Sequence, residues 1–161
     1  MIIFVSVISL LLDGVISKYA SNSLFIPLIT IMSLIIIYPY FQNSYKYIRY
    51  CAILGFLYDI AYMNTIFYNF FIFIILGIFI SFLYYLFSNT LFVTILISLA
   101  IIFVYRIINM LFVLIFKGNN INLNIFIKSI YSSLILNILF CILGYVLTKK
   151  YSKKHNILRI N

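Results

Sequence analysis

A few polar and charged side chains lie within long apolar stretches of this 161-residue sequence, and they are its first candidates for chemistry. Asp13 and Asp59 are the only acidic residues, and Arg106 is a basic residue inside an apolar run. Asn109 follows Arg106 by three positions, which places both on one face of a helix. Asn137 interrupts a later apolar run, where its amide could form a hydrogen bond between helices.

Catalytic and metal chemistry has few candidates in this sequence. General acid–base catalysis needs titratable groups, and the chain offers two carboxylates and one histidine, His155, in a basic C-terminal segment. No metal-ligand spacing and no glycine-rich phosphate loop occurs in the sequence. Cys51 and Cys141 lie in apolar runs, where a thiol behaves as a small hydrophobic group. The sequence therefore predicts a protein that is not an enzyme and that has no metal and no cofactor.

The elements that carry these residues are predicted to be transmembrane helices. The chain is 66% hydrophobic and 8% charged, whereas a soluble domain carries about 25% charged residues. The apolar runs are continuous, without the polar alternation of a membrane β-barrel. A transmembrane helix needs about 20 mostly apolar residues. The segments that approach this length are residues 2–17, 24–41, 50–63, 67–87, 91–116 and 125–148.

The predicted fold is therefore an all-α integral membrane protein, a compact bundle of about six transmembrane helices in one unit at residues 1–148. The segment 50–63 is the shortest, and a segment that dips into the membrane without crossing it stays an alternative. Small residues at four-residue spacing allow helices to approach closely. Gly55 in the third segment, and Gly77 with Ser81 in the fourth, are the helix-packing candidates.

The basic residues predict the orientation of the bundle. The C-terminal tail, residues 149–161, contains Lys149, Lys150, Lys153 and Lys154. Because cytoplasmic segments of membrane proteins are rich in Lys and Arg, we expect this tail in the cytoplasm, where its lysines could contact membrane lipid. The net charge of +9 could also suggest nucleic acid. We expect no nucleic-acid binding, because no basic face is large enough to neutralise many phosphates.

The intramembrane polar residues have three possible roles. Asp13, Asp59 and Arg106 fall in the same half of the predicted membrane, and such groups usually face the interior of a bundle. An Asp59–Arg106 pair is a natural hypothesis, because each charge needs a partner at low dielectric. We favour a structural polar clamp that holds the bundle together. A binding or transport site, and a contact with a partner's transmembrane helix, stay open.

The order of these segments resembles the MreD family of bacterial rod shape-determining proteins. The second segment begins near Pro27 in FIPLITIMSLIIIYP, and the short third one carries Gly55 and Asp59 in GFLYDI. A long fifth segment, Asn137 in SSLILNILF and a basic tail complete a pattern that covers nearly the whole chain. One departure is the stretch AYMNTIFYN, where the family often has a glycine.

The resemblance implies a non-enzymatic scaffold of the cell-elongation machinery in the bacterial cytoplasmic (inner) membrane. Such a scaffold would be a multi-pass protein that binds an MreC-like bitopic protein. It would act with the MreB filament system and the cell-wall synthases through indirect contacts, and help to organise lateral peptidoglycan synthesis and cell shape. A homo-oligomer stays open.

A second family is the alternative. The substrate-binding S component of an energy-coupling-factor vitamin transporter is similar in size and in its six-span layout. It would bind a vitamin near the place where Asp13, Asp59 and Arg106 converge. However, the first segment, IIFVSVISLLLDGV, lacks the alanine-spaced pattern typical of the helix that docks the coupling subunit. We therefore prefer the shape-determining role.

Overall fold

The computed structural model describes residues 2–20, 28–62, 67–117 and 123–155. Within these ranges the chain is helical and contains no strand, which confirms the predicted all-α fold. The elements are α1 (Ile2–Ala20), α2 (Ile29–Ile37), the short 3-10 helix η1 (Tyr38–Tyr40), α3 (Ser44–Tyr62), α4 (Tyr68–Leu86), α5 (Leu91–Lys117) and α6 (Leu123–His155).

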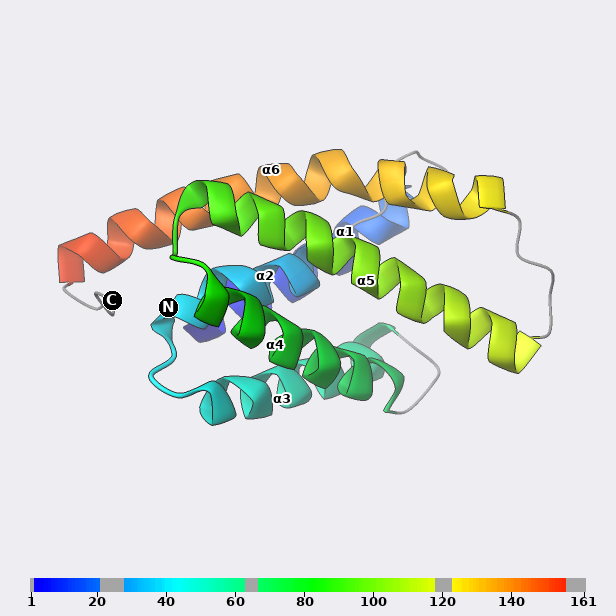
Figure 1. The fold of residues 1–161 in the computed structure, drawn as a ribbon, viewed down its shortest axis with the longest axis horizontal. Coiled ribbons are helices and arrows are strands. Elements are labelled where there is room, and N and C mark those ends of the chain that lie inside the picture. Colours follow the sequence, from blue (N-terminus) through cyan, green and yellow to red (C-terminus); the bar gives the residue numbers. More distant parts are fainter. Residues whose placement is uncertain (1, 21–27, 63–66, 118–122, 156–161) are drawn as a thin grey trace.

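The helices are arranged around α2. Successive helices pack as the pairs α1–α2, α3–α4 and α5–α6, and α2 also contacts α4, α5 and α6 (Figure 1). Every residue of α2, ITIMSLIII, is buried. A helix that is hydrophobic on all sides has no polar face to turn outward, so it lies in the centre of the bundle.

The surface of the bundle is apolar, as expected in lipid. Within the described ranges, three helices are long and apolar enough to cross a membrane, at Tyr68–Leu86, Leu91–Phe112 and Ile130–Lys150. Large hydrophobic side chains such as Phe103, Tyr131 and Leu143 are at least half exposed, whereas Asp13 and Asp59 are buried. This distribution is the reverse of that in a water-soluble protein and indicates a helical membrane bundle.

The helix boundaries differ from the predicted ranges, and three of the differences bear on the argument. Helix α2 begins at Ile29, and the predicted residues 24–27 lie outside the described ranges. Helix α3 begins at Ser44 instead of residue 50, so its 19 residues reach about 28 Å, close to the thickness of the hydrocarbon core. Helix α6 continues to His155, so the first part of the predicted basic tail is helical.

Candidate functional site

Asp13 of α1 binds the beginning of α2. Its carboxylate accepts hydrogen bonds from the backbone N–H of Ile29 and of Thr30, both at 2.8 Å, and the residue is only 3% exposed. The first N–H groups of a helix have no partner within the helix, and water cannot reach them inside the bundle. The helix dipole also favours a negative charge at this end. Asp13 therefore caps α2 from a neighbouring helix.

Asn137 of α6 completes the cap of α2. Its Oδ1 atom accepts a hydrogen bond of 2.8 Å from the backbone N–H of Leu28, next to the two groups bound by Asp13. The side chain of Asn137 is fully buried, and its Nδ2 atom donates to the carbonyl of Ser133 in its own helix. Side chains from α1 and α6 thus bind three consecutive N–H groups, which holds three helices together at one point.

Asp59 of α3 has the same relation to α4. Its Oδ1 atom accepts from the backbone N–H of Asn69 at 3.0 Å and from Asn69 Nδ2 at 2.8 Å. Its Oδ2 atom accepts from the backbone N–H of Phe70 at 3.1 Å. Asp59 is 2% exposed, so these contacts replace all the water that the carboxylate would otherwise bind. We call Asp13, Asp59, Asn69 and Asn137 the capping cluster.

The hypothesised pair between Asp59 and Arg106 does not form. Within the described ranges no ion pair involves Arg106, and its Nε and Nη2 atoms are buried without a hydrogen-bond partner. Both oxygens of Asp59 are bound by the beginning of α4, so the helix N-terminus takes the place of a cationic partner. Asp13 is bound in the same way, so neither carboxylate is left to pair with Arg106.

Asn109, the polar neighbour of Arg106, connects α5 to α4. Its Oδ1 atom accepts a hydrogen bond from the hydroxyl of Tyr68, the first residue of α4. Its Nδ2 atom donates to the carbonyl oxygen of Tyr105 at 3.0 Å. Both ends of the amide are therefore used within the bundle, as in a structural clamp.

The comparison with protein families covers the helices that carry the capping cluster. The family model described as rod shape-determining protein MreD matches residues 1–154 of the 161-residue chain. The chain belongs to the MreD family. Comparisons with curated proteins and with solved structures found no match. MreD proteins belong to the rod-shape system together with MreC and MreB, and the family is not a known enzyme family.

The predicted packing residues of this MreD bundle lie where helices meet. A Cβ atom on Gly55 of α3 would lie 2.5 Å from the backbone oxygen of Asn69, and one on Gly77 of α4 would lie 2.9 Å from Cys51 Sγ. Both glycines therefore allow α3 and α4 to approach closely. Ser81 has a polar contact instead, because its hydroxyl lies 3.3 Å from that of Tyr38.

Several bundle contacts were missed from the sequence. Tyr47 is fully buried and donates to the carbonyl of Leu34 at 3.1 Å, although it belongs to a tyrosine-rich stretch. The Tyr50 hydroxyl donates to Ser6 Oγ at 2.6 Å and connects α3 to α1. Asn69 was missed as well, because an asparagine at the end of a polar loop gives no signal of burial. The burial of Tyr47 could have been predicted from the sequence, because Tyr47 fits a hydrophobic pattern with the helical period of 3.6 residues.

The charged groups on the described surface of the bundle are cations. Both acidic side chains of the chain are buried in the capping cluster, whereas Lys149 and Lys150 of α6 are exposed. Lys149 Nζ donates to the Tyr145 hydroxyl at 3.1 Å and lies over the same ring, and Lys150 is exposed. The side chains of Lys153 and Lys154 lie outside the described set.

Proposed function

We propose that this MreD-family protein is a non-enzymatic scaffold of the cell-elongation machinery that binds an MreC-like bitopic protein in the membrane. The family match over residues 1–154 carries the proposal, because it assigns the chain to rod-shape determination. In this role the bundle helps to organise lateral peptidoglycan synthesis, with the MreB filaments and the cell-wall synthases reached through the bitopic partner. A homo-oligomer is compatible with this role.

The distribution of polar groups supports a scaffold. Asp13, Asp59, Asn109 and Asn137 all form hydrogen bonds that hold helices of the same chain together. The outer surface offers large apolar side chains from α4, α5 and α6. Lipid provides no hydrophobic contrast, so a transmembrane partner would be held by close packing of such side chains and a few polar contacts.

We propose that the protein is a multi-pass protein of the bacterial cytoplasmic membrane with its C-terminus in the cytoplasm. The basic end of α6, with Lys149 and Lys150, supports this orientation through the preference of Lys and Arg for the cytoplasmic side. Lys46 and Arg49, exposed near the beginning of α3, would lie on the same side.

Depletion of the protein in a rod-shaped host tests the role. We expect rounded cells, and we expect the wild-type chain to restore rods. A photo-crosslinking residue at Phe103, which is half exposed, should capture the bitopic partner if the α5 face is used. The matched control is Ile102, the neighbouring residue of the same helix, which is fully buried and should capture none. Rod-shaped depleted cells that lose vitamin uptake would instead support the transporter alternative.

A further inference from the structure

An apolar groove lies between α1 and α6. It has a volume of about 610 Å³ and is lined by Phe4, Val5 and Ile8 of α1 and by residues of α6. The residues of α6 that line it are Phe140, Leu143, Gly144, Leu147 and Thr148.

The two helices that form the groove are held side by side by α2. Both α1 and α6 pack on α2, and a Cβ atom on Gly144 would meet Ile36 Cδ1 at 2.4 Å. The glycine thus lets α6 lie against α2 while its neighbours Leu143 and Leu147 remain mostly exposed. The result is an apolar groove whose open side faces the surrounding lipid.

The groove is about as long as one leaflet of the hydrocarbon core is thick. From Phe140 to Thr148 the helix rises about 12 Å, which is close to half of a hydrocarbon core of about 30 Å. One turn beyond Phe140, Asn137 binds the beginning of α2, and Asp13 binds the same place from α1. These two bonds tie α6 and α1 to α2 next to the residues that line the groove. A partner's transmembrane helix would need a surface that continues across both leaflets, whereas an acyl chain needs one.

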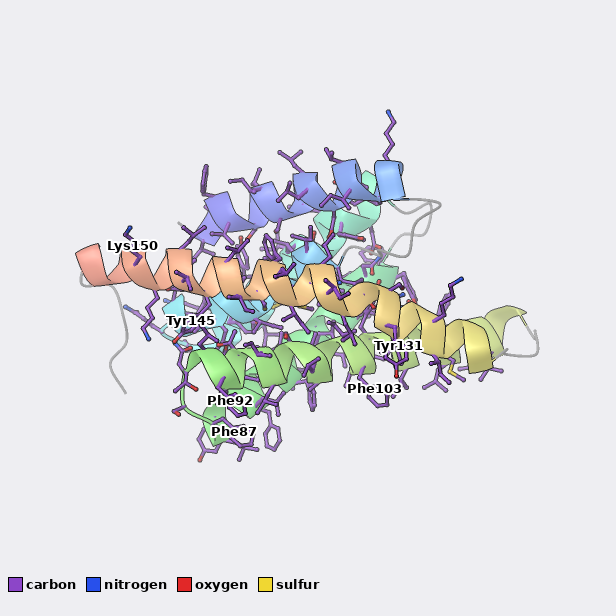
Figure 2. All side chains as sticks on the ribbon, turned by 90° about the horizontal axis from the view of Figure 1, so that it is seen from above. Phe87, Phe92, Phe103, Tyr131, Tyr145 and Lys150 are labelled. Carbon is purple, nitrogen blue, oxygen red and sulfur yellow. The ribbon has the colours of Figure 1, made fainter. Side chains whose placement is uncertain are left out.

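The mouth of the groove is positively charged. Lys150 lies three residues after Leu147 and seven after Leu143, so it continues the groove-lining stripe of α6 beyond the apolar part. Its side chain is exposed at the end of α6 that lies near the beginning of α1 (Figure 2). Both carboxylates of the chain are buried elsewhere, so no acidic side chain of the protein neutralises this charge.

We propose that this groove is a binding site for one anionic phospholipid, whose acyl chain lies between α1 and α6 and whose headgroup contacts Lys150. A leaflet-long apolar groove that ends at an unneutralised lysine matches both parts of such a lipid. The proposal does not depend on the scaffold role, because it requires only the bundle itself.

Tryptophan fluorescence offers a direct test, because the chain contains no tryptophan. Phe4→Trp places a reporter in the groove wall, and Phe92→Trp on α5 is the matched control. Both phenylalanines are 69% exposed, and Phe92 lies on the side of α5 away from α1 (Figure 2). Each variant is reconstituted in phosphatidylcholine vesicles that contain an equal fraction of brominated phosphatidylglycerol or brominated phosphatidylcholine, since bromine quenches nearby tryptophan.

We expect brominated phosphatidylglycerol to quench the Phe4→Trp reporter more than brominated phosphatidylcholine does, with no such preference at Phe92→Trp. Adding Lys150→Gln should reduce the preference about fivefold, the effect of one basic residue near an anionic surface, whereas Lys46→Gln should leave it unchanged. Equal quenching by the two lipids at position 4, or weak quenching by both because protein covers the groove, would overturn the proposal. All substituted positions are exposed, and a thermal unfolding curve of each variant verifies that it folds.

Discussion

Asp13 and Asp59 perform the same task at two places in the bundle. Each carboxylate binds two consecutive backbone N–H groups at the beginning of another helix. A carboxylate bound in this way needs no cationic partner, because the helix N-terminus carries partial positive charge. This is how a chain with two acidic residues can bury both.

Removing the Asp13 carboxylate should destabilise the bundle. Asp13→Ala leaves the N–H groups of Ile29 and Thr30 buried and unpaired, and each such group is worth about 1–3 kcal/mol. We expect the free energy of unfolding in mixed micelles to fall by about 2–6 kcal/mol. Ser17→Ala on the same helix is the control, since this exposed hydroxyl bonds only to the carbonyl of Gly14. Equal stability of the two variants would contradict the capping role.

Arg106 should be dispensable for stability. Its Nε and Nη2 atoms are buried without an acceptor among the described residues, so Arg106→Met removes a poorly solvated charge and should leave the free energy of unfolding unchanged or higher. The exchange of Asp59→Arg with Arg106→Asp should not restore the accumulation that Asp59→Arg loses, because Asp59 binds α4 and not Arg106. Accumulation of the single and the double variant is measured on immunoblots of membranes. Rescue in the double variant would show that Asp59 and Arg106 do pair.

At the scale of elements, the contact between α3 and α4 depends on its two glycines to different degrees. Gly55→Ala would place a methyl group against the backbone of Asn69, which cannot move aside, so we expect a loss of about 1–3 kcal/mol. Gly77→Ala would meet the side chain of Cys51, which can shift, so its loss should be smaller. The free energy of unfolding of the two variants is compared in mixed micelles. A larger loss for Gly77→Ala than for Gly55→Ala would contradict the role of the backbone contact at Gly55.

Helix α2 shows why position within the bundle outweighs length. It has 9 residues, too few to cross a membrane alone, yet it is the most enclosed helix. Its N-terminus lies inside the bundle and depends on α1 and α6 for its caps. A short helix with a buried end is stable only as part of the complete assembly.

At the scale of the whole molecule, the alternating helix directions predict which turns share a side of the membrane. The turn before α3, the turn between α4 and α5, and the C-terminal end of α6 lie at one end of the bundle (Figure 1). In a chain whose two cysteines are replaced by serine, single cysteines at Gln42, Ser88 and Lys150 should resist an impermeable thiol reagent added to intact spheroplasts. A cysteine at the exposed Ser17 should react. Labelling at Lys150 from outside would reverse the proposed orientation.

Composition and the continuous apolar runs determined the class of this protein. A chain with 66% hydrophobic and 8% charged residues must cover its surface with lipid, and its continuous apolar runs must then be helices. Asp13, Asp59 and Asn137 could be chosen from the sequence as internal polar groups, because such residues are rare in lipid and usually face the bundle interior. The MreD pattern was also readable, since it rests on the order of segments.

Only the tertiary structure decided what those residues bind. Asp59 was paired with Arg106 from their depth, yet it binds the N-terminus of α4, because backbone N–H groups leave no mark in a sequence. The burial of Tyr47 and the groove between α1 and α6 depend on which helices become neighbours. In a sequence where almost every position is apolar, the hydrophobic pattern cannot distinguish a face turned to lipid from a face turned to another helix.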